Sequence, residues 1–340
     1  MGRAPLNRDK MILLDLSESV QVRPATSRPF GFRATMRCGR RMPTQERGCN
    51  VLNGEPRRLW STRNGQAIGR LGQGTWQMGL DAGLREQEVA ILQLGVDRNL
   101  RHIDTAEAYG GGEAERIVGD AIRGRRGDVF VTTKVRPQNA SREGVVQSLE
   151  NSLTRLGTDA VDLYLLHWPS QNHPLEQSLA GLQDCVARGL TRYIGVSNFT
   201  TGLLEDAMRL TDGQIATNQV AYSLMAREPE VTLLPYMESH GVFLTAYSPL
   251  RPLMGENLSE AAHQALRDVA SRHGVTEATV AMAWVLGPDS RLVTAIPKTL
   301  HRDHLEQNIQ ALALVLTSDD LHMLDEAFPP PTADLQLRKL

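Results

Sequence analysis

From residue 70 onward, short apolar segments alternate with longer amphipathic stretches, and this alternation limits the fold more than any other feature of the chain. The amphipathic stretches repeat their apolar residues every three or four positions, as helices that pack one face on a core do. The apolar segments are rich in Val, Ile and Leu, which is typical of buried parallel strands. These segments are RLGQGTW (70–76), HIDTA (102–106), VFVTTK (129–134), VDLYLLH (161–167), YIGVS (193–197), ATNQV (216–220), VFLTAYS (242–248) and LVTAIP (292–297).

Eight strand–helix repeats in about 260 residues match the size of a closed barrel of parallel strands. The predicted fold is therefore α/β, a single-domain (β/α)8 TIM barrel with an additional C-terminal helix at SDDLHMLDEAF (318–328). A doubly wound sheet is the alternative architecture. It needs a G-x-G-x-x-G turn after the first strand, and GQGTWQMG (72–79) lacks the third glycine at the required place.

The first 60 residues differ from the rest in composition. They contain twelve Lys and Arg against five Asp and Glu, whereas the 340-residue chain as a whole has a formal net charge of −2. Residues 1–60 also lack a sustained hydrophobic period, so we predict a basic, disordered extension there and the barrel over residues 61–340. The total charge gives no reason to expect nucleic acid or a membrane as a partner, and no apolar run approaches the ~20 residues that cross a bilayer.

The positions of the three cysteines indicate the cellular compartment of the protein. Cys38 and Cys49 lie in the extension, and Cys185 is the one cysteine of the predicted barrel. Because a barrel with one cysteine cannot form an internal disulfide, the sequence favours a reducing compartment and predicts a cytoplasmic protein. Cys185 lies in the helical stretch LEQSLAGLQDCVARGL (175–190), where we expect a buried, unreactive thiol.

Four side chains that are costly to bury follow three predicted strands: Asp104, Tyr109, Lys134 and His167. Parallel-barrel enzymes keep their chemistry at these carboxyl ends of the strands. A tyrosine has an ordinary pKa of about 10, and a nearby lysine ammonium lowers that pKa by favouring the phenolate. With Asp104 orienting Lys134 and His167 binding a carbonyl oxygen, the set suits protonation of an oxygen that gains negative charge when hydride reaches a carbonyl carbon.

Two other patterns indicate no site. His301 and His304 are three residues apart and can share a helix face, but no third ligand accompanies them, so no metal is predicted. Gly110, Gly111 and Gly112 are not followed by the Gly-Lys-Ser/Thr of a phosphate loop. They are expected to let the backbone turn tightly beside Tyr109.

The barrel region, from about Arg70 to the C-terminus, resembles the aldo-keto reductase superfamily throughout. It is most similar to the bacterial short-loop reductases that act on methylglyoxal and other small aldehydes. The resemblance rests on GQGTW (72–76), DTAEAYG (104–110), TTK (132–134), LLHWP (165–169), GVSNF (195–199), NQV (218–220), AYSPL (246–250) and IPKT (296–299), which occur in the order of the family.

The resemblance implies that Tyr109 is the general acid for reduction, that Lys134 and Asp104 lower its pKa, and that His167 orients the carbonyl. It also implies a set of cofactor contacts. These are Gly74 and Thr75 at the first strand; Ser197, Asn198 and Gln219 on the nicotinamide carboxamide; Tyr247 stacked on the nicotinamide ring; and Ser248 and Leu250 along the pyrophosphate.

At the other end of the cofactor, Lys298 and Thr299 match the positions that meet the 2′-phosphate of NADPH. Many family members have Arg where this chain has His304, and Gln307 stands where a Glu often meets the adenine; Asn308 keeps its adenine-side position. Arginine offers an always-charged fork, whereas histidine is mostly neutral at pH 7. NADPH is therefore the expected cofactor, and NADH use stays open.

By the same resemblance, Trp76 and Trp168 are walls of the substrate pocket, and a small hairpin within residues 59–76 covers the barrel bottom. The loop after His167 and the tail after Phe328 are short, which favours a small aldehyde or dicarbonyl substrate and an NAD(P)H-dependent carbonyl reductase.

A monomer is expected. The alternative functions are an NADPH-binding regulatory or sensing subunit with little turnover, and an isomerase with Lys134 as a Schiff base. Asp104 disfavours the isomerase because it keeps Lys134 charged.

Overall fold

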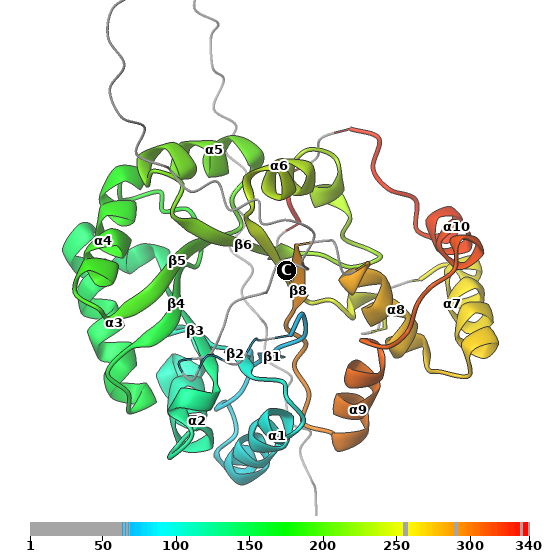
Figure 1. The fold of residues 1–340 in the computed structure, drawn as a ribbon, viewed down its shortest axis with the longest axis horizontal. Coiled ribbons are helices and arrows are strands. Elements are labelled where there is room, and N and C mark those ends of the chain that lie inside the picture. The colour runs from blue at the N-terminus through cyan, green and yellow to red at the C-terminus, as the bar shows by residue number, and fades with distance from the viewer. Residues whose placement is uncertain are drawn as a thin grey trace, which may run out of the picture. The chain divides into compact units, whose positions relative to one another are not determined.

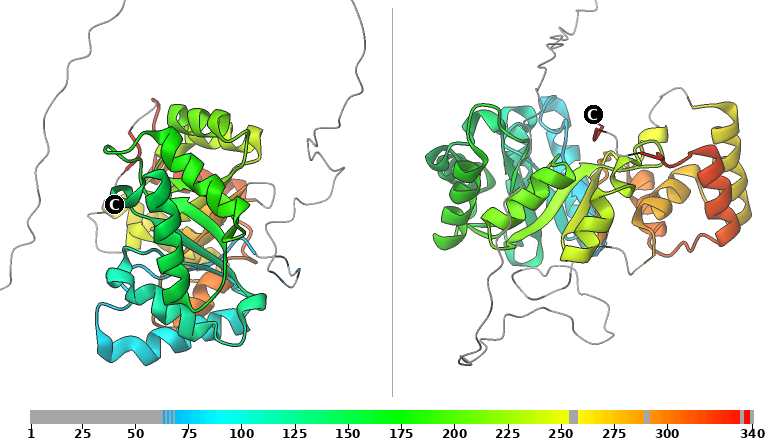
Figure 2. Two further views of the ribbon diagram at one scale, coloured as in Figure 1. Left: turned by 90° about the vertical axis from the view of Figure 1, so that its left-hand side faces the viewer. Right: turned by 90° about the horizontal axis from the view of Figure 1, so that it is seen from above.

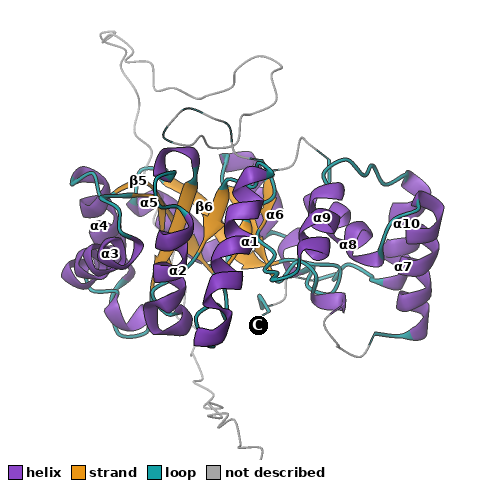
Figure 3. Ribbon diagram, turned by 90° about the horizontal axis from the view of Figure 1, so that it is seen from below, coloured by secondary structure: helices purple, strands orange, loops and turns teal. Residues whose placement is uncertain are grey.

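The computed structural model describes residues 63, 65, 67, 69–253, 258–288, 292–333 and 336–338. The basic extension predicted for residues 1–60 and most of the expected hairpin lie outside the described residues. Within the described part, the chain forms one eight-stranded parallel sheet surrounded by helices (Figure 1). Figure 3 shows the strands on the inside and the helices outside them.

The strands follow one another in the sheet in chain order, and every neighbouring pair is parallel. Their bounds are β1 Gln73–Gly74, β2 His102–Asp104, β3 Phe130–Val135, β4 Val161–Leu166, β5 Thr191–Ser197, β6 Ile215–Ala221, β7 Phe243–Tyr247 and β8 Val293–Ala295. A parallel bridge between Leu71 and Ala295 then joins the segment before β1 to β8. Since the first and last strands meet, the sheet closes, and the predicted (β/α)8 barrel is confirmed.

A helix follows each strand, as the alternating pattern predicted. The helices are α1 Arg85–Asp97, α2 Glu113–Ala121, α3 Arg142–Leu156, α4 Leu175–Ala187, α5 Thr201–Leu210, α6 Leu233–His240, α7 Glu260–His273, α8 Glu277–Leu286, α9 Arg302–Gln310 and α10 Ser318–Ala327. The additional C-terminal helix is α10, which lies beside α7 away from the strands (Figure 2). Helix α9 ends at Gln310, although apolar residues continue in the sequence to Leu316, and Val315 beyond the helix is 81% exposed.

Capping residues fix where several helices begin and end. Ser141, Ser259 and Thr276 each accept a hydrogen bond from a backbone N–H in the first turn of the helix that follows. Gly157 and Gly274 end α3 and α7 in the left-handed conformation that a residue without Cβ adopts readily. These local signals set the length of each helix and so the point at which the chain enters the next strand.

Alternate residues of β3 and β4 face the inside of the barrel. Phe130, Leu163 and Leu165 form a small apolar cluster separate from the main core, with Tyr193 packed against it. The main core instead lies between strands and helices and includes Val131 and Leu166. Because side chains alternate along a strand, this assignment also fixes which later residues of β3 and β4 point toward the mouth of the barrel.

A buried ion network ties together the amino ends of β3, β4 and β5. The Asp162 carboxylate is fully buried and lies 2.7 Å from Arg126 Nη2 and 3.3 Å from Arg192 Nη1. It also accepts the backbone N–H of Val131 at 2.9 Å. A buried carboxylate with several donors is stable as a unit, and removing it leaves the guanidinium of Arg126 poorly compensated.

We expect Asp162→Ala to lower the free energy of unfolding by about 3 kcal/mol, because it breaks a buried ion pair from one side. Urea denaturation followed by circular dichroism measures the change. The control is Asp206→Ala, whose pair with Arg209 is exposed, and its unfolding midpoint should match that of the wild type. Equal midpoints for all three proteins would show that the buried network does not stabilise the barrel.

Candidate active site

The carboxyl ends of the strands bring together the four side chains that the sequence singled out. Asp104 is the last residue of β2, Lys134 lies near the end of β3, and His167 follows β4 directly. Tyr109 begins a short 3-10 helix, Tyr109–Gly112, between β2 and α2. Parallel strands place all four at the same end of the barrel, which is where this fold carries its active sites.

Lys134 and Asp104 form a buried ion pair at the centre of this group. Their side chains are in direct contact and almost completely inaccessible. The ammonium also donates to the backbone oxygen of Thr105 at 2.9 Å and to the Tyr109 hydroxyl at 3.4 Å. These are three acceptors for the three N–H groups of a lysine. Burial alone would lower the pKa of Lys134, but attraction to Asp104 and Tyr109 outweighs it and raises that pKa, so the ammonium stays charged.

Gln219 completes the surroundings of Asp104. Its side-chain amide donates to the second carboxylate oxygen at 2.8 Å, while Lys134 holds the first. Both oxygens of a buried carboxylate are therefore satisfied. This contact gives Gln219 a position that the resemblance did not imply, since it had assigned Gln219 to the nicotinamide carboxamide.

The pKa of Tyr109 is raised above its ordinary value because the phenol is buried. Lys134 acts in the opposite direction and lowers this pKa, as the sequence reasoning expected, whereas the Asp104 charge raises it. Burial is the largest of these effects, so the net direction is upward and differs from the expected lowering. The phenol is consequently protonated at neutral pH, the form that a proton donor needs.

His167 lies against Tyr109 and is neutral. The two rings meet edge to face with centroids 5.6 Å apart. Burial, followed by the charges of Lys134 and Arg136, lowers the pKa of His167 to about 3. A neutral imidazole can donate one hydrogen bond to a carbonyl oxygen without carrying a charge.

Three successive glycines hold the backbone beside Tyr109. Gly110, Gly111 and Gly112 all have positive φ, at 56°, 64° and 98°. A Cβ on Gly110 would lie 2.8 Å from the Met78 backbone oxygen, and one on Gly112 would lie 2.7 Å from Arg155 Cδ. The turn therefore needs glycine for its conformation, as the sequence predicted, and at Gly110 also for close packing against the backbone.

A second group of predicted residues lies next to the ion pair. The Asn198 amide donates to the His167 backbone oxygen at 3.2 Å and to Ser197 Oγ at 3.0 Å. Tyr247, at the end of β7, donates its hydroxyl to Asn198 Oδ1 at 2.9 Å. These contacts connect the ends of β4, β5 and β7, so the structure brings Ser197, Asn198 and Tyr247 together with the four catalytic candidates.

Backbone strain marks the same region. Asn198 and Ser248 have φ of 64° and 49°, in the left-handed region that non-glycine residues rarely occupy. Each directly follows the end of a strand, β5 for Asn198 and β7 for Ser248. Strained residues that persist in a folded protein concentrate at ligand-binding sites.

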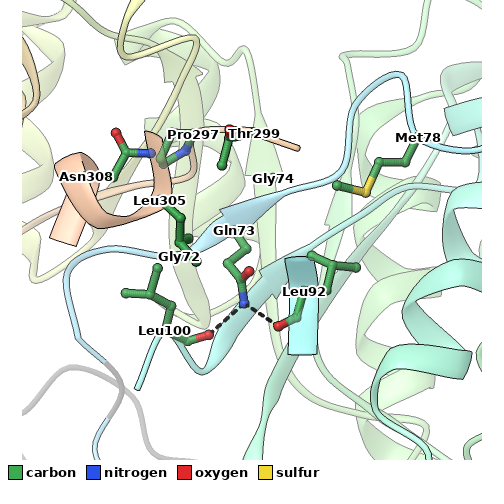
Figure 4. A pocket seen from close by; sticks show the side chains of 10 residues that line it. All are labelled: Gly72, Gln73, Gly74, Met78, Leu92, Leu100, Pro297, Thr299, Leu305 and Asn308. Atoms are coloured by element: carbon green, nitrogen blue, oxygen red, sulfur yellow. Dashed lines mark hydrogen bonds between the residues drawn. The ribbon is translucent and has the colours of Figure 1, made fainter. Parts of the chain in front are cut away.

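A pocket between β1 and α9 collects three further predicted cofactor contacts, Gly74, Thr299 and Asn308 (Figure 4). None of the four catalytic candidates lines it. Gln73 spans its floor and donates to the backbone oxygens of Leu92 and Leu100 at 3.2 and 2.9 Å. Thr75 is buried, and its hydroxyl donates a hydrogen bond to the Asp104 backbone oxygen at 2.9 Å, which fixes the end of β2.

The remaining predicted residues are placed separately. Lys298 and His304 are exposed, Gln307 and Leu250 are half-buried, and the His304 ring packs against His301 with centroids 5.0 Å apart. Trp76 is 55% exposed after β1, and Trp168 is half-buried after β4. The structure thus leaves the residues predicted to meet the NADPH phosphate, and the two tryptophans, outside the hydrogen-bonded cluster around Lys134.

Sequence reasoning missed Glu107 and Arg136. Glu107 Oε1 accepts the backbone N–H of Arg136 at 2.8 Å and the Asn139 amide at 3.1 Å. The Arg136 Nη2 in turn donates to the Glu107 backbone oxygen at 3.2 Å. The signal was the spacing: Arg136 follows Lys134 by two residues, which places both on the same face of an extended chain.

One further sequence expectation concerns Cys185. Cys185 is fully buried and burial raises its pKa to about 12, which agrees with an unreactive thiol. Over the described residues, no three side chains of the metal-binding types gather closely enough to hold an ion. None of the helices in the described part of the chain has the length and apolar character of a membrane span.

The chain matches known proteins over nearly all of its described part. The model of the aldo/keto reductase family matches residues 70–328. Methylglyoxal reductase YeaE of Escherichia coli K12 is 40% identical over 262 residues, which are 77% of this chain and 91% of that protein. Methylglyoxal reductase DkgB of E. coli O157:H7 is 35% identical over 260 residues, 75% and 91% of the two chains.

Among solved structures, an aldo/keto reductase from Klebsiella pneumoniae in complex with NADP and acetate is 39% identical. It superposes with a TM-score of 0.77 over 82% of this chain and 98% of its own. The family match covers more than half of the sequence, and this solved aldo/keto reductase shares the fold. The chain therefore belongs to the aldo/keto reductase family.

Proposed function

We propose that this protein reduces small aldehydes and ketones to alcohols with NADPH, and that Tyr109 is the proton donor. The observation that carries the proposal is the direction of one hydrogen bond. The Tyr109 oxygen accepts from the Lys134 ammonium, so its own O–H is left to donate elsewhere. The neutral His167 beside it supplies a second group that binds an oxygen.

Each residue has a defined part in this chemistry. When bound, the reduced nicotinamide supplies a hydride to the carbonyl carbon. Tyr109 donates its proton to the carbonyl oxygen, and Lys134 stabilises the phenolate that remains. Asp104 holds Lys134 in place with Gln219 bound to its other oxygen. His167 donates a hydrogen bond that orients the carbonyl.

The donor set fits a nicotinamide cofactor. Tyr247 offers a half-buried aromatic face at the end of β7, and the amides of Asn198 and Gln219 lie near it in the sheet. Lys298 places an exposed positive charge after β8, which suits a phosphate. We assign the cofactor to Gly74, Thr75, Ser197, Asn198, Gln219, Tyr247, Ser248, Leu250, Lys298, Thr299, His304, Gln307 and Asn308.

A small substrate is favoured by the length of the surrounding loops. Helix α4 begins at Leu175, so the loop after His167 is short. The exposed ring of Trp76 and the half-buried ring of Trp168 are available as pocket walls. The names of the two E. coli relatives support methylglyoxal as a substrate of the same size class.

Tyr109→Phe should lower kcat for methylglyoxal at least a thousandfold, because it removes the proton donor and keeps the ring. NADPH absorbance at saturating cofactor measures turnover, and fluorescence titration should give an NADPH Kd within twofold of the wild type. The matched control is Tyr193→Phe, inside the barrel and away from the cluster, which should retain activity. Full activity of Tyr109→Phe would refute the mechanism, and a wild type that binds NADPH without reducing any carbonyl would favour the sensing role.

His304→Arg should tighten NADPH at least fivefold more than NADH, because an always-charged guanidinium attracts the additional 2′-phosphate. Isothermal titration with both cofactors measures the two Kd values. The control is His322→Arg on α10, an exposed histidine that pairs with Glu326 and should change neither affinity. Equal effects of His304→Arg on the two cofactors would remove His304 from the 2′-phosphate site.

A further inference from the structure

We propose that Arg136 makes the site selective for carbonyl compounds that carry a carboxylate, such as aldehydo acids and oxo acids. The proposal rests on the reductase function proposed above and names a substrate class for it. Arg136 is not among the residues that the sequence assigned to substrate or cofactor. Its placement, its anchor and its exposure lead to this inference.

The strand pattern points Arg136 into the mouth of the barrel. Phe130 faces the barrel interior, and Lys134, four residues later, lies on the same side of β3. Arg136 follows by two residues and keeps an extended backbone, with φ −75° and ψ 154°. Pro137 comes next, and a residue before proline is confined to this extended region. The side chain of Arg136 therefore continues the inward row one step beyond Lys134.

The neighbouring strand ends with His167 at the corresponding level. In the β3–β4 pair, Lys134 lies opposite Leu165 and Val135 opposite Leu166. The pairing continues with a hydrogen bond from the His167 N–H to the Val135 oxygen at 2.9 Å. The next step of the register sets Arg136 beside His167. The Arg136 charge also acts on the imidazole, where it contributes to the lowered pKa of His167.

Glu107 anchors the guanidinium without enclosing it. Arg136 Nη2 donates to the Glu107 backbone oxygen at 3.2 Å, and Nε lies 3.7 Å from the Glu107 carboxylate. That carboxylate is buried and is already bound by the Arg136 backbone N–H and by Asn139. The Arg136 side chain is 42% exposed, and within the described part of the chain its Nη1 has no hydrogen-bond acceptor.

These features fit a carboxylate on the substrate. A guanidinium presents parallel N–H groups that match the two oxygens of a carboxylate, and a fixed anchor reduces the entropy lost on binding. A substrate whose carbonyl oxygen meets Tyr109 and His167 would have its neighbouring carbons within the range of Arg136. The carboxylate takes no part in the reaction, so hydride transfer to carbon and proton transfer from Tyr109 are unchanged.

The test compares 4-carboxybenzaldehyde with its methyl ester, methyl 4-formylbenzoate, which differ in charge and share the reacting aldehyde. Values of kcat/KM are measured with NADPH for the wild type, Arg136→Met and Arg136→Lys. We expect Arg136→Met to lower kcat/KM at least tenfold for the acid and less than twofold for the ester. Arg136→Lys should be intermediate for the acid, because it keeps the charge and loses the fork.

Salt and a distant arginine provide the controls. At saturating NADPH, raising salt from about 20 to about 500 mM should lower the wild type's kcat/KM for the acid and leave that for the ester unchanged, because screening acts on charge pairs. Arg142→Met, which removes an exposed arginine paired with Asp184 on α4, should leave the ratio of acid to ester unchanged.

An equal loss for both substrates in Arg136→Met would show a structural role, and no loss for either would also overturn the proposal. If the wild type reduces the ester but shows no charge-dependent difference, the selectivity fails and the reductase function stands. If it reduces neither compound nor methylglyoxal, the reductase function itself fails.

Discussion

The arrangement of this site depends on the burial of one ion pair, Lys134 with Asp104. A buried ion pair is stable only when the remaining hydrogen-bond donors and acceptors of both charged groups also find partners. Asp104 is bound by Lys134 and Gln219, and the three N–H groups of Lys134 reach Asp104, the Thr105 backbone and Tyr109. The pair therefore fixes the position of the phenol and dictates which way its proton can go. The ends of the strands, the triple-glycine turn and the ring of His167 surround this pair and the phenol.

Much of the fold could be predicted because its signals are local. The eight apolar segments predicted as strands correspond to the eight parallel strands β1 to β8. The convergence of Asp104, Lys134 and His167 follows from the same topology, since parallel strands end at one edge. Exposed Val315 shows where an apolar spacing is no guide, because the residue finds no surface to pack against.

Three features of the site depend on contacts that no sequence pattern encodes. The net pKa direction of Tyr109 is set by burial, which outweighs the lysine that the sequence reasoning had emphasised. Gln219 binds Asp104 across the barrel, a contact between residues 115 positions apart. The guanidinium of Arg136 is anchored on Glu107, 29 positions away in the sequence, and its register sets it beside His167.

The central claim is that a protonated Tyr109 donates the proton in the reduction while a neutral His167 beside it orients the carbonyl. The most direct measurement is kcat/KM for an aromatic aldehyde at saturating NADPH between pH 5 and about 11. The raised pKa of Tyr109 keeps the phenol protonated up to high pH, and the His167 pKa of about 3 keeps the imidazole neutral throughout. We expect a flat profile that falls only above about pH 10, the ordinary tyrosine value, as the proton donor is lost. A rise or fall in kcat/KM centred between about pH 6 and 8, where an unshifted histidine titrates, would contradict this account.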